Sequence, residues 1–347
     1  FPIGYTAGYL MLLLFVAAPL RRSRAYTIPD FAQIRFEGSP MLRKLTTYLV
    51  VVICWLYIVP QMHGAALTLS IATGFPSWVG PVIVAAVVCV TVLSGGMRSV
   101  TFVQAFQYWF KLAALVIPTI FLLGRAIPEH SSSGHAQALY AQLESANAMN
   151  LYETVSIILA LLFGTLGLPH VLVRFYTNPT GQAARTTTVI VLCLLSAFYL
   201  LPTTLGVLGL LYTPELGATN ETDATILLLP SRLFEGFLGD ALTAIVVGGA
   251  FAAFLSTTSG LVVSLAGALS QEFFSGTVRG FRISTVLATA LPVLIAVVTN
   301  SLALAGAIGN VFAFTASTIC PLLLLGIWWR SLTARGAIAG LLAGGIS

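Results

Sequence analysis

Charged side chains are scarce in this sequence. Only 8% of its 347 residues are charged, whereas 58% are hydrophobic, and the mean hydropathy is +0.96. Soluble domains usually carry about 25% charged residues. So few charges cannot cover the surface of a water-soluble protein of this length, and we therefore predict a polytopic membrane protein. The net charge of +5 then reports membrane topology and does not indicate binding to nucleic acid.

Cysteines and nucleotide-binding or catalytic motifs are also scarce. The four cysteines lie in or beside apolar runs and form no CxxC pair, which argues against a disulfide framework or a thiolate metal site. No Walker motif or nucleotide fingerprint is present, so ATP-driven transport would need another chain. The spans contain no evident set of nucleophile, histidine and acid. We predict that the protein is not an enzyme and has no organic cofactor.

Apolar runs of about 20 residues, the length that crosses a membrane, recur along the chain. We count about ten: 1–20, 45–73, 79–95, 100–124, 152–169, 186–212, 240–270, 283–299, 302–329 and the start of one from 336. Because the chain begins and stops on apolar runs, we expect the natural protein to extend beyond both ends.

Basic residues gather in alternate connections between these runs. One side holds Arg21, Arg22, Arg24, Arg35, Arg43, Lys44, Arg98, Arg174, Arg185, Arg279, Arg282, Arg330 and Arg335. The other side holds Arg125 and Arg232. By the positive-inside rule the first span runs from the outside to the cytoplasm of a cell membrane. Two longer outer segments, around 125–151 and 213–239, are either lids or plain connectors.

The run FAAFLSTTSGLVVSLAGA contains four consecutive hydroxyl residues. On a helix, one narrow face presents Ala253, Ser256, Thr257 and Gly260, at i, i+3, i+4 and i+7. Hydrocarbon has no water to satisfy a hydroxyl, so each must bond its own helix, a neighbour or a solute. This face is therefore either a close helix–helix contact or a weakly charged oxygen site for a monovalent cation.

The fifth span, IILALLFGTLGLPHVLVRFYT, is interrupted by Gly164, Gly167 and Pro169. Broken helices at membrane depth occur where they line a cavity or are buried in protein, and their freed backbone groups form binding sites. The alternative is a helix that ends early at Pro169, with His170 at the cytoplasmic boundary. Gln104 in the fourth span and Gln61 in the second are further polar positions, which could also link helices.

Four blocks resemble the sodium:solute symporter family, in its cation/acetate or monocarboxylate branch. They are RAYTIPDFAQIRF (24–36), LSGGMRSVTFVQAFQ (93–107), FGTLGLPHVLVRFYTNPTGQAAR (163–185) and AFAAFLSTTSGLVVSLAGALSQEF (250–273). The second block resembles the family signature, in which a turn at Gly95 and Gly96 opens a helix after an apolar run. The likeness extends over essentially the whole chain, in the family's order.

The resemblance implies an all-α broken-helix fold with two inverted repeats of five helices. We expect a single transmembrane domain over 1–347. Within it, 1–124 would be a partial first repeat, 152–329 the second repeat and 336–347 the start of a further helix. The first core helix would precede Phe1, so we expect that this stretch alone does not transport.

The resemblance also implies sodium as the coupling ion. The backbone carbonyl of Ala253 and the hydroxyls of Ser256 and Thr257 match the family's sodium motif and would form half of the site. Gln104 stands where some members carry an Asp that contributes to a second sodium site. Because Gln is neutral, we expect one cation for each substrate.

The expected substrate is a small monocarboxylate such as acetate, taken up by alternating access. Its lining residues would be Gly164, Thr165, Gly167, Gln61 and Gln104. Three alternatives stay open: proton-coupled symport through His170 or His63, transport of another small solute, and a transporter-like sensor domain of a signalling protein.

Overall fold

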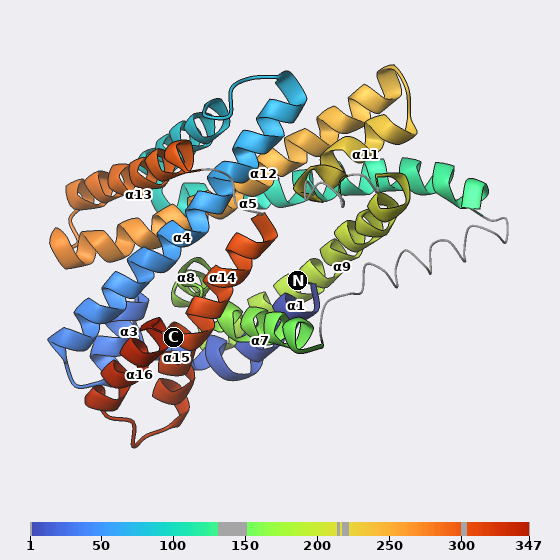
Figure 1. The fold of residues 1–347 in the computed structure, drawn as a ribbon. Helices are drawn as coiled ribbons and strands as arrows, with labels where there is room; N and C mark the ends of the chain where they lie inside the picture. The colour runs from blue at the N-terminus through green and yellow to red at the C-terminus, as the bar shows by residue number, and fades with distance from the viewer. Residues whose placement is uncertain (1, 131–150, 214–215, 217–221, 300–303, 347) are drawn as a thin grey trace.

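The computed structural model shows a bundle of helices (Figure 1). It describes residues 2–130, 151–213, 216, 222–299 and 304–346. In this part of the chain, eight helical segments are long and apolar enough to cross a membrane, and two shorter apolar helices accompany them. The chain is therefore a multi-pass membrane protein. Most of the predicted outer lid 125–151 lies outside the described residues, as do 214–215 and 217–221.

The elements follow the predicted order of spans. They are α1 (Pro2–Met11), the π-helical turn η1 (Leu12–Val16), α2 (Ala17–Arg22), α3 (Ile28–Arg35), α4 (Pro40–Thr73), α5 (Val79–His130), α7 (Leu151–Gly167), α8 (Pro169–Tyr176), α9 (Gly181–Tyr212), the 3-10 turn η2 (Thr222–Ala224), α11 (Thr225–Leu233), α12 (Phe237–Phe273), α13 (Val278–Val298), α14 (Leu304–Ser317), α15 (Ile319–Trp328) and α16 (Ala334–Ile346). The first span comprises α1, η1 and α2, the fifth comprises α7 and α8, and the ninth comprises α14 and α15.

The predicted turn at Gly95 and Gly96 lies within one long helical element, α5, at the point where two apolar stretches meet, Val79–Gly95 and Ser99–Ala126. A straight helix of 52 residues would be about 78 Å long, more than twice the ~30 Å hydrocarbon core. The helix is distorted at Gly95. A Cβ added there would collide with Ser99, whereas Cβ atoms four residues apart in a regular helix are about 5–6 Å from each other.

The same series of three helical segments occurs twice along the chain. A crossing segment, a short helix and a very long helix follow one another as α1–α2, α3 and α4, and again as α9, α11 and α12. The long helices, of 34 and 37 residues, pack side by side (Figure 1). By the predicted topology α3 is on the inner side and α11 on the outer side, so the two halves are inverted. The repeat boundaries 1–124 and 152–329, and the further helix at 336–347, stay predictions.

Arg35 connects α3 to the C-terminal end of α15. Its guanidinium donates to the backbone carbonyls of Gly326 (2.6 Å), Trp329 (3.0 Å) and Arg330 (3.2 Å). Carbonyls at the end of a helix lack partners within the helix and form the negative end of its dipole. A positively charged donor at this position therefore fixes the packing of the two helices.

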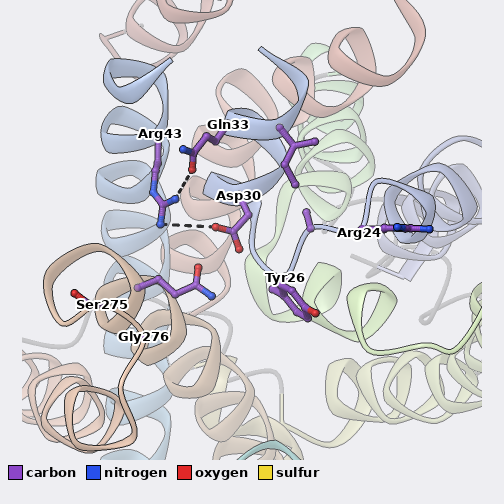
Figure 2. A pocket seen from close by; sticks show the side chains of 10 residues that line it. Arg24, Tyr26, Asp30, Gln33, Arg43, Ser275 and Gly276 are labelled. Atoms are coloured by element: carbon purple, nitrogen blue, oxygen red, sulfur yellow. Dashed lines mark hydrogen bonds and ion pairs between the residues drawn. The ribbon is translucent and has the colours of Figure 1, made fainter. Parts of the chain in front are cut away.

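Arg43, near the start of α4, connects three helices at the inner face (Figure 2). Its Nε is 3.1 Å from Glu272 on α12, and its Nη2 is 3.8 Å from Asp30 on α3, while Nη1 donates to Gln33. Arg43, Asp30 and Gln33 line a cavity of about 490 Å³ together with Tyr26. Arg43 pairs with a carboxylate from each of two other helices, so this cluster is an ionic link between helices.

Candidate functional site

The hydroxyl face predicted from the sequence lies midway along α12. Ser256 is about 28 Å from the start of this helix. Ala253, Ser256 and Thr257 are half-buried, and Gly260, at the end of the same face, is buried. The face is thus at membrane depth and is not fully covered by neighbouring side chains.

The hydroxyls of Ser256 and Thr257 differ from those of Ser259 and Ser264 on the same helix. Hydroxyls within helices commonly donate to the carbonyl four residues earlier. Ser259 does so to Leu255 (2.6 Å) and Ser264 to Gly260 (2.9 Å). The hydroxyls of Ser256 and Thr257, by contrast, form no hydrogen bond to any described residue. Their oxygens are available to a solute.

Gln104 of α5 contacts this face directly. Its Nε2 donates to the backbone carbonyl of Ser256 at 2.5 Å, and it lies 3.3 Å from the position of a Cβ on Gly260. Its Oε1 accepts a hydrogen bond from Arg174, whose other terminal nitrogen donates to Thr101 at 3.2 Å. The predicted lining residue and the predicted ion site are therefore adjacent.

Arg174 was expected in a cytoplasmic connection. It lies in the last turn of α8, near the end of the fifth span, and is half-buried. Because a guanidinium can only donate, it fixes which way the Gln104 amide faces: the oxygen is turned to Arg174 and the nitrogen to Ser256. A positive charge is thus held one amide group away from the hydroxyl face.

The fifth span is broken, as the sequence predicts. Leu168 separates α7 from α8 with φ −67° and ψ 118°, and Pro169 opens α8. The carbonyl of Leu168 accepts from the amides of Val171 and Leu172, both at 3.1 Å. The break leaves the last carbonyls of α7 and the positive end of the α8 dipole at membrane depth.

The residues predicted to line a substrate site at this break are packed against other helices in this conformation. Gly164 faces the backbone of Phe312 on α14, and Gly167 faces Thr315. Thr165 is fully buried and donates to Leu161 at 2.6 Å, with Gly8 of α1 directly against it. Their role as lining residues stays a prediction that requires α7 to separate from these neighbours.

A group of aromatic rings that packs around His170, next to the break, escaped sequence analysis. The His170 ring meets the edge of Tyr57 on α4 at 5.4 Å between centroids, and Tyr57 in turn meets Phe312 at 5.9 Å. Tyr5 of α1 also contacts Phe312, at 5.6 Å. The Nδ1 atom of His170 is buried and has no hydrogen-bond partner among the described residues. No regular spacing links these four helices in the sequence.

Gln61 lies one turn beyond Tyr57 on α4 and is buried. Gly64 lies on the same face, and a Cβ added to it would be 2.5 Å from the ring of Phe254 on α12. Gln61 therefore lies near the crossing of α4 and α12. His63 points elsewhere. Its Nε2 is 3.2 Å from the carbonyl of Ala296 and 3.3 Å from the hydroxyl of Thr299, both at the outer end of α13.

The oxygen atoms at this site suit a monovalent cation. Among the described residues there is no group of three or more His, Cys, Asp or Glu that could hold a metal ion. The oxygens near Ser256 and Thr257 are therefore hydroxyls and backbone carbonyls. Such neutral ligands hold a singly charged ion weakly enough for it to leave again.

Comparisons with known proteins agree with this architecture. Residues 1–344 match the model of the sodium:solute symporter family. The chain is 29% identical over its full length to the uncharacterized symporter YwcA of Bacillus subtilis and covers 71% of that protein. It is 27% identical, also over its full length, to a monocarboxylic acid transporter of Corynebacterium glutamicum, of which it covers 69%. A Na+-coupled sialic acid symporter, solved in a substrate-bound outward-open state, shares the fold with a TM-score of 0.73. That likeness covers 99% of this chain and 76% of the other, at 14% identity.

Proposed function

The chain belongs to the sodium:solute symporter family, and from this premise we propose that it couples sodium entry to the uptake of a small monocarboxylate such as acetate. The name of the Corynebacterium glutamicum relative supports this class of substrate. The solved sialic acid symporter supports the fold alone, because only 14% of residues are identical.

The observation that carries the sodium site is the pair of unbonded hydroxyls on α12. Thr258 also has a hydroxyl with no hydrogen bond to the described residues, but that residue is fully buried, whereas Ser256 and Thr257 are only half-buried, so their oxygens can be reached by an ion. We propose that Ser256, Thr257 and the carbonyl of Ala253 form one side of the sodium site. Gln104 is neutral and its oxygen is already bonded to Arg174, so it offers no negative charge to a second cation.

We propose that the carboxylate binds at the break between α7 and α8, near Gly164, Thr165, Gly167 and Gln61. The positive end of a helix dipole favours an anion. In the present conformation α14 packs against α7 at this point, so substrate entry requires the two helices to move apart. Rocking of one helix group against another, the usual motion in such transporters, would provide this.

Coupling then follows from the proximity of two opposite charges. A sodium ion beside α12 attracts a carboxylate at the break more strongly in a poorly screened site than in water. Linkage requires the converse as well, so the carboxylate raises the affinity for sodium by the same factor.

A second candidate is proton coupling through His170. Its buried Nδ1 has no partner among the described residues, so this atom could accept a proton during the cycle. The neighbouring Arg174, one turn along α8, opposes a positive charge on the ring. For this reason we favour sodium.

The test is uptake of labelled acetate into proteoliposomes that contain the protein encoded by its complete gene. Three conditions are compared: an inward sodium gradient at equal pH, an inward proton gradient without sodium, and no gradient. We expect accumulation in the first condition only, with competition by propionate or pyruvate but not by a neutral sugar. Accumulation driven by protons alone would support the second candidate and refute the sodium proposal.

A further inference from the structure

Four arginines surround the N-terminal end of α9 at the predicted cytoplasmic face. Arg22 and Arg185 line a cavity of about 460 Å³ together with Gly181, and Arg21 and Arg24 line a neighbouring cavity of about 400 Å³ that also includes Arg22. Arg21 donates to the carbonyl of Pro179 at 3.4 Å. The two cavities therefore share one arginine and form a continuous basic surface.

These arginines have no acidic partner in the described part of the chain. Both ion pairs found there belong to Arg43, at a different cluster. The Nε atom of Arg21 is buried without a hydrogen-bond partner. The N-terminal end of α9, which is 32 residues long, adds the positive end of its dipole at the same place. Uncompensated positive charge of this kind attracts an anion with several acceptor oxygens.

The position of the cluster indicates the source of the anion. The most apolar stretch of α9 is little buried within the described residues, so this part of the helix is open to lipid. The first turn of α9, next to Arg22 and Arg185, therefore lies at the level of the lipid headgroups. Basic pockets between membrane helices on the cytoplasmic side bind anionic headgroups.

A separate apolar groove lies deeper in the membrane on the same pair of helices. It has a volume of about 510 Å³ and lies between α1 and α9, with Leu10, Leu192 and Ser196 at its inner end. Leu192 is about 10 Å and Ser196 about 16 Å along the helix from Arg185. The inner end of the groove therefore lies near the ~15 Å depth of one leaflet, where an acyl chain ends.

We propose that the seam between α1–α2 and α9 binds one anionic phospholipid of the inner leaflet. The phosphate lies between Arg22 and Arg185, and one acyl chain follows α9 to the groove at Leu192 and Ser196. The charged cluster and the apolar groove are separate observations on the same pair of helices, and a lipid is the ligand that satisfies both.

The test is native mass spectrometry of the complete protein with mixed phosphatidylglycerol and phosphatidylcholine. We expect one phosphatidylglycerol molecule to stay bound to the protein, and an excess of phosphatidylcholine to displace it poorly. The double variant Arg22→Gln, Arg185→Gln should weaken this retention at least tenfold. The matched double variant Arg279→Gln, Arg282→Gln, which removes two exposed arginines at the start of α13, should keep it. Equal weakening by both double variants would overturn the proposed site.

Two further comparisons distinguish a lipid from other occupants. Ser196→Trp fills the groove and should weaken retention at least threefold, whereas Ala197→Trp, exposed on α9 outside the groove, should not. Competition by inorganic phosphate as effective as that by phosphatidylglycerol would overturn the lipid proposal in favour of a free anion. No effect of Ser196→Trp would overturn the placement of an acyl chain in the groove. Circular dichroism and gel filtration confirm that each variant is folded.

Discussion

Gly164→Ala should destabilise the protein, whereas Gly206→Ala should not. A Cβ at Gly164 would lie 2.8 Å from the Cα of Phe312 and 2.9 Å from its carbonyl carbon, and would collide with the carbonyl oxygen. Backbone atoms cannot move aside as a flexible side chain can, so α7 and α14 must separate. Overpacking of this kind costs about 1–3 kcal/mol. Gly206, within α9, has no atom within 4 Å of its added Cβ.

The difference between the two variants is measurable as an apparent melting temperature in one detergent. With an unfolding entropy of about 2.1 cal/mol/K per residue, a loss of 1–3 kcal/mol over 347 residues lowers the melting temperature by about 1–4 °C. Gly206→Ala should leave it unchanged or raise it, because alanine favours the helix by up to about 1 kcal/mol. If Gly164→Ala melted at the same temperature as Gly206→Ala, the backbone contact between α7 and α14 would not exist as described.

Three other substitutions should also change stability, each measured as an apparent melting temperature. Arg35→Ala removes three charge-assisted hydrogen bonds to the end of α15 and should cost about 2–3 kcal/mol, whereas the exposed Arg330→Ala should cost almost nothing. Arg43→Ala leaves two partly buried carboxylates unpaired and should lower the free energy of unfolding by about 1–3 kcal/mol. If Arg43→Lys had the melting temperature of the unsubstituted protein, the simultaneous contacts of the guanidinium with both carboxylates would not contribute to stability. Gln104→Leu leaves Arg174 without its amide acceptor and should lower the free energy of unfolding by about 1–3 kcal/mol. An unchanged melting temperature would show that the two hydrogen bonds linking Arg174 to Ser256 through Gln104 do not form as described.

Hydropathy and local breakers predicted the spans and the break in the fifth one. Both signals are local: an apolar run must cross the membrane, and Pro169 cannot continue the hydrogen bonding of a helix. Charge counts gave no sign that Arg174, near the end of a span, turns towards the protein to reach the acceptor Gln104. The glycine pair at Gly95 gave the position of the bend in α5 but not its form, since glycine pairs are typical of turns and of bends alike.

Contacts between distant segments were beyond the reach of sequence patterns. The rings of Tyr57, His170 and Phe312 come from three helices, and nothing in their local sequence relates them. One long-range contact did have a signal. Gly4 and Gly8 form a GxxxG pair on α1, and the structure packs them against Leu161 and Thr165 of α7. That motif could have predicted the close approach of the two helices.

Sequence patterns can propose residues for a sodium site but cannot show whether their hydroxyls are free. Spacing placed Ser256 and Thr257 on one face of α12, but spacing cannot tell whether a hydroxyl bonds its own helix. Only the coordinates distinguish this pair from Ser259, whose hydroxyl is already bonded to Leu255.

The sodium dependence of acetate uptake in three matched variants tests the central claim most directly. Removing one ligand oxygen through Ser256→Ala or Thr257→Val should raise the sodium concentration for half-maximal uptake about tenfold or more, because a lost ligand of ~1.4 kcal/mol changes an equilibrium tenfold. Ser259→Ala, which removes a hydroxyl three residues along the same helix that is bonded to its own backbone, should leave that concentration unchanged. Equal sodium dependence in all three variants would contradict a cation site on this face of α12.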